Sequence, residues 1–121
     1  MRYDVDGSLD SGFGDAGMVT TVLGSNSRGE AILLQADGRF LVAGQAEIDG
    51  RWVFALARYQ ADGTLDASFG DGGTVTAEVG DGHAYAYSVA VQPGTNKIVV
   101  GGYAYDSVNH RFDFAVARFW P

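Results

Sequence analysis

The sequence predicts an all-β chain made from two copies of one repeat. Its 121 residues include several short β-branched segments bounded by turn residues, and no segment has the capped 3.6-residue apolar period of a helix. RYDVDGSLDSGFGDAGMVTTVLG, from Arg2, aligns without a gap with RYQADGTLDASFGDGGTVTAEVG, from Arg58, and 13 of 23 positions are identical at an offset of 56. WVFALARY (52–59) also matches FDFAVARF (112–119) at an offset of 60. Self-similarity at such a fixed period indicates a repeat architecture.

The first copy contains four predicted strands. Residues 18–23 (MVTTVL) predict a short outer strand, because they are β-branched and bounded by glycine. Residues 31–35 (AILLQ) and 39–45 (RFLVAGQ) predict a hairpin around an Ala-Asp-Gly turn. Residues 52–59 follow as a third strand whose large and small apolar side chains alternate.

The second copy repeats this order. Residues 74–79 (TVTAEV) predict the outer strand, 87–92 (YSVAVQ) and 97–103 (KIVVGGY) the hairpin, and 112–120 the third strand. Pro93 falls in the hairpin turn, where no ladder donor is needed.

Four-stranded antiparallel sheets that repeat around an axis are the blades of a β-propeller. Both faces of the third strand are apolar, as expected of a sheet packed between two neighbours, whereas a two-layer sandwich leaves one polar face. The predicted fold is therefore two four-stranded β-propeller blades in permuted order. We expect residues 1–121 to form one two-blade unit, with repeat 1 at about 2–57 and repeat 2 at about 58–117.

The motif FALARYQADGTLDASFGDGGTV (54–75), with AVQP and KIVVGGY downstream, resembles the delta-60 repeat of bacterial β-propeller proteins. The resemblance covers nearly the whole chain, twice. The first copy departs from it in turns, with Gly12, Ala16 and Ala36 where the second has Ser68, Gly72 and Pro93. The resemblance implies a propeller fold in a bacterial secreted or cell-surface protein, and it supplies no catalytic residues. The compartment is otherwise open, because the N-terminus has no signal peptide pattern.

The phase of the repeat predicts assembly. The outer strand at 18–23 lacks a third strand of its own blade, and the third strand at 112–120 lacks an outer strand. Two blades cannot close a ring and leave apolar faces in water. We therefore expect a head-to-tail homotrimer or homotetramer, with the trimer favoured, or an excerpt of a longer chain. Because Arg2 and Arg118 are equivalent, we expect residues 1–5 to be displaced or disordered.

Composition excludes several partners. The formal charge of −7 disfavours nucleic acid and anionic membrane surfaces, and no apolar run is long enough for membrane insertion. The absence of cysteine excludes disulfides and thiolate metal sites.

Two acidic motifs have a structural interpretation. Arg58 and Asp66, with their copies Arg2 and Asp10, are expected to form charge-assisted bonds between the third strand and the next turn. The loops DVDGSLD (4–10) and QADGTLD (60–66) resemble calcium loops, so calcium is the one candidate cofactor. The favoured interpretation is an Asp-Gly turn without metal, because one loop replaces the first aspartate with glutamine.

A possible ligand site comes from the connections at 24–30, 45–51, 80–85 and 103–111, which a propeller gathers on one face. Their acidic, amide, basic and aromatic side chains suit a carbohydrate or protein ligand, or a cation through the histidines; solvated loop residues are the alternative. The candidates are Asp81, His83, Tyr85, Asp106, Asn109, His110 and Arg111. No nucleophile, phosphate-loop or zinc motif is present. The sequence thus favours a non-enzymatic scaffold or interaction module, with a glycan-binding or glycan-cleaving propeller as the alternative.

Overall fold

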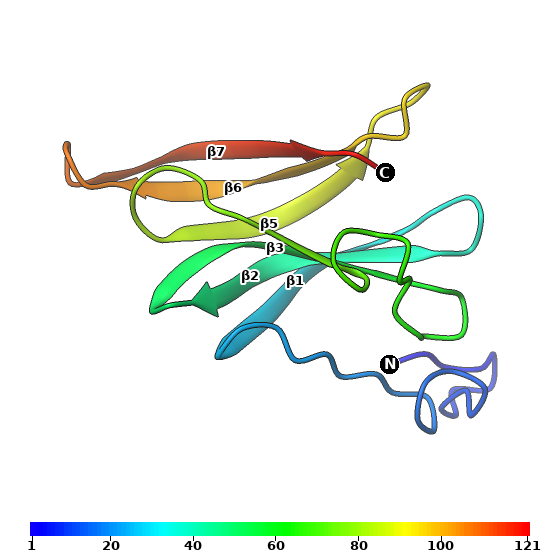
Figure 1. Cartoon of the computed structure of the whole chain (residues 1–121). Coiled ribbons are helices and arrows are strands. Elements are labelled where there is room, and N and C mark those ends of the chain that lie inside the picture. Colours follow the sequence, from blue (N-terminus) through cyan, green and yellow to red (C-terminus); the bar gives the residue numbers. More distant parts are fainter.

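The computed structural model describes all 121 residues and contains two antiparallel sheets, packed face to face (Figure 1). The first sheet has the order β1 (Asn26–Leu34), β2 (Phe40–Ile48), β3 (Arg51–Tyr59), β4 (Thr74–Ala77). The second has the order β5 (Ala84–Val91), β6 (Ile98–Asp106), β7 (Arg111–Phe119). The expected all-β, bladed architecture is confirmed, and no helix is long and apolar enough to cross a membrane.

The core lies between the two sheets. Leu41 of β2 and Phe54 and Leu56 of β3 are buried in one cluster with Ile98 and Val100 of β6. The second sheet contributes small residues to the same cluster, namely Ala84, Ala86 and Ala115. The large side chains of β3 therefore share a core with alanines of the second sheet, because the alternation along β3 places Phe54 and Leu56 on one face and its alanines on the other.

Four strands extend further than the sequence predicted. The predicted connections at 24–30, 45–51 and 103–111 are mostly strand, and β5 begins at Ala84, within the predicted connection at 80–85. Pairing continues because register shifts between Gly29 and Ala31 and between Ala86 and Ser88 absorb an extra residue. Gly44 and Gly102 lie opposite these shifts, where a Cβ would collide with backbone. β2 and β3 are joined by only Asp49 and Gly50, both with positive φ (50° and 78°), as in a tight hairpin.

The prediction of an outer strand at 18–23 is wrong for the single chain. Met18 forms only an isolated bridge with Asp15, whereas β4, its copy, pairs with β3. A strand requires a partner, and none is present for this segment. The second sheet correspondingly has three strands, and the outer edge of β7 is free. The N-terminal segment lies on the face of the first sheet that is remote from the second sheet (Figure 1).

Residues 1–5 are ordered in the single chain, contrary to the expected displacement. The Arg2 N–H donates to the Gly17 carbonyl (3.0 Å), just as the Arg58 N–H donates to the Gly73 carbonyl (2.9 Å). Tyr3 also forms an antiparallel bridge with Leu9. The N-terminal turn thus adopts the conformation of its copy after β3, because its own residues supply the required partners.

Candidate functional site

The outer face of the second sheet is an exposed apolar layer, which we call the aromatic face. It consists of Tyr87, Tyr103, Phe112, Phe114 and Val116. Tyr103 stacks near Tyr87 (5.4 Å between ring centroids) and meets Phe112 edge-on (5.1 Å). Phe114 is 102% exposed and Val116 69%, yet their copies Phe54 and Leu56 are fully buried between the sheets. The aromatic face therefore repeats a surface that is covered elsewhere in the same chain.

The outer face of the first sheet, which we call the receiving face, is the copy of the surface that the second sheet packs against the first. It consists of Ile32, Leu34, Phe40, Val42, Ala55 and Ala57. Ile32 and Leu34 are exposed, whereas their copies Val89 and Val91 pack against the core. Ala55 and Ala57 correspond to Ala115 and Ala117 of the second sheet, which also belong to or pack against that core.

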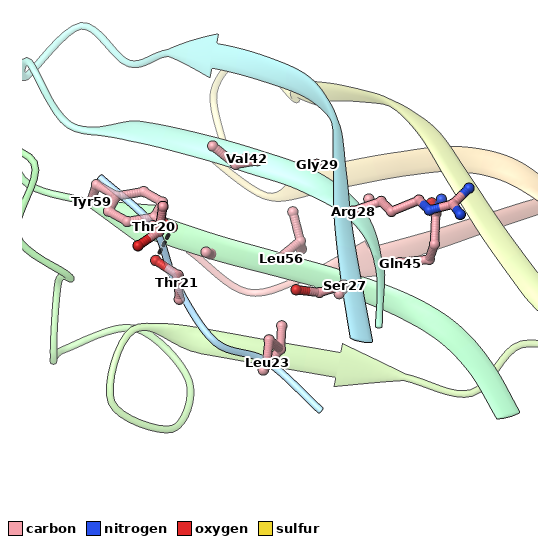
Figure 2. Close-up of a pocket in the computed structure, with 13 residues that line it drawn as sticks. Thr20, Thr21, Leu23, Ser27, Arg28, Gly29, Val42, Gln45, Leu56 and Tyr59 are labelled. Carbon is pink, nitrogen blue, oxygen red and sulfur yellow. Dashed lines mark hydrogen bonds between the residues drawn. The ribbon is translucent and has the colours of Figure 1, made fainter. Parts of the chain in front are cut away.

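Two cavities open between the receiving face and the N-terminal segment. One of about 570 Å³ has an almost wholly apolar lining that includes Phe13, Ile32 and Leu34. The other, of about 280 Å³, is lined by Ala55, Ala57 and residues 20 and 21, among others (Figure 2). The Thr21 and Tyr59 hydroxyls lie 2.5 Å apart across it. The N-terminal segment therefore covers the receiving face only in part.

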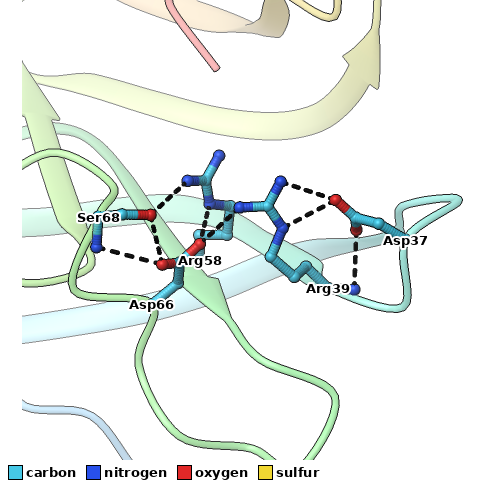
Figure 3. Close-up of polar contacts among 5 residues, drawn as sticks. All are labelled: Asp37, Arg39, Arg58, Asp66 and Ser68. Atoms are coloured by element: carbon cyan, nitrogen blue, oxygen red, sulfur yellow. Dashed lines mark hydrogen bonds and ion pairs between the residues drawn. The ribbon is translucent and has the colours of Figure 1, made fainter.

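Asp66 is the centre of a buried polar network (Figure 3). The Nε of Arg58 donates to its carboxylate at 2.8 Å and the guanidinium of Arg39 at 2.9 Å. The Ser68 hydroxyl and amide also donate to it, at 2.6 and 3.1 Å. The Ser68 hydroxyl, with Arg39, the Ser68 amide and Arg58, lowers the pKa of Asp66 well below its usual range, although burial acts in the opposite direction. The Arg58 guanidinium also lies over the Phe69 ring (4.5 Å), so this network fixes the turn after β3.

The first repeat contains a reduced form of this network. Arg2 Nε lies 2.5 Å from Asp10, whose carboxylate also accepts the Gly12 N–H (2.8 Å). Gly12 cannot supply the hydroxyl that Ser68 provides, and no second arginine reaches Asp10. Arg2 additionally donates to the Ala61 carbonyl at 2.5 Å, which joins the two turns. Asp10 is thus held by fewer donors than Asp66.

Sequence reasoning missed Arg39 as a partner of Asp66. The two residues are separated by 27 positions, so local spacing could not join them. A signal was nevertheless present, since Lys97 occupies the equivalent position before β6 and keeps a positive charge there.

Most of the candidate ligand residues already have partners within the chain. Asp81 accepts the amide (3.1 Å) and the hydroxyl of Ser107, which joins two connections. Asp106 accepts the amide (3.1 Å) and the side-chain nitrogen (2.6 Å) of Asn109 in the β6–β7 hairpin. The Ser107 hydroxyl lowers the pKa of Asp81, and the Asn109 side chain lowers that of Asp106. Both carboxylates therefore stabilise loops.

The remaining candidates lie in different environments. His83 Nδ1 accepts the Trp52 N–H (3.1 Å), and its ring lies 6.4 Å from that of Tyr85. His110 instead lies near the Tyr105 hydroxyl (3.4 Å). Arg111 pairs with Asp113 at the surface (3.0 Å). No group of three or more metal-ligating side chains is gathered, and the glycan interpretation stays a prediction.

Calcium is expected to leave the thermal stability unchanged. Asp62 accepts the amide (2.9 Å) and hydroxyl (2.7 Å) of Thr64, and Asp6 does the same with Ser8 (2.9 and 2.6 Å). These oxygens already close an Asp-Gly turn, which leaves few free ligands for a cation that takes six to eight oxygens. Thermal melts with millimolar calcium and with chelator should coincide. A higher melting temperature in calcium would contradict this interpretation.

The strand order repeats in the two sheets, and each outer sheet face resembles one side of the interface that is packed between them. Both properties are those of β-propeller blades. The chain belongs to the family described as "Domain of unknown function (DUF5122) beta-propeller", which matches residues 35–69 and 94–121, more than half of its length. The expected relationship to a β-propeller repeat family is confirmed. No curated protein and no solved structure matches the chain.

Proposed function

We propose that this protein is a non-enzymatic propeller module that assembles head to tail into a closed ring of identical copies. One observation carries the proposal: the chain contains one complete interface between blades and both halves of a second one. Phe114 and Val116 are exposed at one end of the stack, and Ile32 and Leu34 at the other. Contiguous apolar faces on this scale are unusual in soluble monomers.

The two faces suit each other because each has a buried copy. Within the chain, Phe54 and Leu56 share the inter-sheet core with Ala115. The same packing between copies places Phe114 and Val116 of one subunit against Ala55 and Ala57 of the next. A heterologous contact of this type closes into a ring when its rotation allows. Three or four copies give six or eight blades, within the usual range for propellers, and we favour three.

Strand donation completes the second sheet. In the first sheet, Val75 lies opposite Leu56 and Ala77 opposite Phe54. The repeat transfers this register to Val19 opposite Val116 of the neighbouring copy, and Thr21 opposite Phe114. Residues 18–23 thereby gain the partner that they lack in the single chain, and β7 gains an outer neighbour. Pairing also covers an edge that otherwise invites uncontrolled association.

An interaction role is favoured over catalysis by the loop chemistry. Asp81 and Asp106 are committed to hydrogen bonds with neighbouring loop residues. The ring would instead present repeated loops around a rigid disc, an arrangement suited to scaffolding or to binding a partner at several equivalent places.

Cysteine cross-linking tests the donated register. With Val19→Cys and Val116→Cys in a chain that has no other cysteine, oxidation should link neighbouring copies into a closed set of three or four. Antiparallel partners have Cα separations within disulfide range. Native mass spectrometry of the unmodified protein at micromolar concentration should give the same copy number.

The matched control places the first cysteine three residues further along the donated strand. Val22→Cys with Val116→Cys is out of register and on the opposite face, so it should cross-link poorly. A discrete monomer in native mass spectrometry, together with no in-register cross-link, would overturn the proposed ring.

A further inference from the structure

Asp10 and Asp66 are equivalent but have unequal partners. Asp66 is held by Arg58 at the end of β3 and by Arg39 just before β2, so one sheet supplies both cations. Asp10 has only Arg2, which lies in its own turn. The side chains of Arg2 and Asp10 are 42% and 23% exposed, against 4% and 3% for Arg58 and Asp66. The first turn therefore retains the carboxylate of the network without its buried setting.

The missing cations lie at the far end of the same chain. Arg118, near the end of β7, is the copy of Arg58, and Lys97, just before β6, is the copy of Arg39. Neither residue forms an ion pair in the structure, and the Lys97 ammonium lies over the Trp120 ring (4.2 Å). One end of the chain thus has a carboxylate with too few partners, and the other end has two cations without one.

We propose that Asp10 changes its partner when the ring forms. Arg118 of the neighbouring copy replaces Arg2 at Asp10, Lys97 of that copy takes the role of Arg39, and residues 1–5 are released. This inference rests on the proposed ring and identifies a cross-subunit contact within it. The partner copy completes a polar site that each single chain leaves incomplete.

Backbone geometry makes the exchange obligatory. The Arg2 N–H donates to the Gly17 carbonyl, and the Arg2 carbonyl accepts the Asp10 N–H (2.9 Å). Arg58 forms the same two bonds with Gly73 and Asp66. A neighbouring β7 that continues in this register brings Arg118 to the same groups. The Asp10 N–H has a single hydrogen to donate, and both arginines would occupy the same position beside Gly17, so Arg2 and Arg118 compete.

Residues 1–5 therefore act as an intramolecular competitor of the neighbouring β7. In the free subunit they keep the N-terminal turn folded, and they exclude the neighbour until its β7 displaces them. Because this competitor is tethered to the site, its effective concentration is high at any protein concentration. Residues 1–5 accordingly set the protein concentration at which rings form.

A disulfide lock tests the exchange. Tyr3 and Leu9 are bridged opposite each other, between the bonds Asp4 N–H to Ser8 and Asp10 N–H to Arg2. They form a non-hydrogen-bonded pair, whose short Cα separation suits a disulfide. The full chain with Tyr3→Cys and Leu9→Cys should be monomeric when oxidised and should form rings when reduced. The control is Leu9→Cys alone, which should form rings under both conditions.

The outcomes separate the two proposals. If the oxidised and reduced chains form rings equally well, the exchange is wrong and the ring stands. If the reduced chain, the control and the unmodified protein are all monomeric, the ring itself is wrong, and the exchange with it.

Two alanine variants provide a second test that needs no disulfide. Arg118→Ala should raise the subunit dissociation constant by about tenfold or more, since it removes a charge-assisted contact between copies. Arg2→Ala should lower the same constant, because it weakens the competitor. Sedimentation velocity over a concentration series measures both. Effects of the same sign, or none for either variant, would overturn the exchange.

Discussion

Phe114→Asp is expected to convert the ring into monomers without unfolding the chain. Phe114 is 102% exposed in the single chain, so the substitution removes no packing there. Its copy Phe54 is fully buried, which is the environment that the ring gives Phe114. An unpaired carboxylate in such an interface costs several kcal/mol. The subunit dissociation constant should therefore rise by about two to three orders of magnitude, as measured by sedimentation velocity.

Val108→Asp is the matched control. Val108 is also well exposed, at 79%, but it lies in the β6–β7 hairpin and belongs to neither apolar face. Its substitution should leave the ring intact. If Phe114→Asp leaves the ring intact as well, the aromatic face is not the contact. If circular dichroism shows that the Phe114→Asp chain is unfolded, Phe114 has a packing role within the chain, and the premise of an exposed face is wrong.

The strand order and the two-faced character of the sheets could be predicted from the sequence. WVFALARY and FDFAVARF alternate large and small apolar residues, and the structure places Phe54 and Leu56 in the core with Ala57 on the opposite face. The repeat offset also identified which strand lacks a neighbour. The sequence shows the basis of both properties directly, in the two-residue alternation of each strand and in the similarity between the two repeats.

The extent of the inner strands could not be predicted. β1 begins at Asn26, in a polar segment (NSRGE) without alternating apolar residues. It is a strand because β2 provides a partner across the register shift at Gly29. Conversely, MVTTVL has strong β propensity and forms no strand, because no neighbour is present. In both cases pairing with a distant segment decides whether a strand forms, and the β propensity of the residues does not indicate that pairing.

The candidate ligand site illustrates the same limit. Propeller connectivity placed Asp81 and Asp106 among the candidate ligand residues, and the structure adds that both accept hydrogen bonds from Ser107 and Asn109 of the β6–β7 hairpin. Whether a carboxylate is free depends on which loops meet in space. The sequence contains the donors, without stating which acceptor each one reaches.

Asp66→Asn is expected to destabilise the folded chain more than any of the substitutions above. The amide keeps the shape of the carboxylate but leaves the buried Arg58 without a counter-charge, whereas Arg39 keeps its ion pair with Asp37 (2.7 Å). Removal of one partner from a buried ion pair costs about 3–5 kcal/mol. Urea denaturation gives the free energy of unfolding, and the Phe114→Asp background keeps assembly from contributing.

Asp10→Asn in that background should cost far less, because its pair with Arg2 is partly solvated. Equal losses would contradict the assignment of Asp66 as the structural centre.

Acid titration should show the same asymmetry. The pKa of Asp66 is lowered in the folded state, first by the Ser68 hydroxyl and then by Arg39, the Ser68 amide and Arg58. A carboxyl with a lowered folded pKa contributes its full stabilisation above its unfolded pKa, about 3.9, and loses it as the pH falls from there toward the folded value. The free energy of unfolding should thus fall more steeply below about pH 4 with Asp66 present than in Asp66→Asn. The other carboxylates are common to both proteins, so the difference between the two pH profiles isolates Asp66. Parallel profiles would mean that the Arg58–Asp66 network stabilises the turn by its shape alone, without a net contribution from charge.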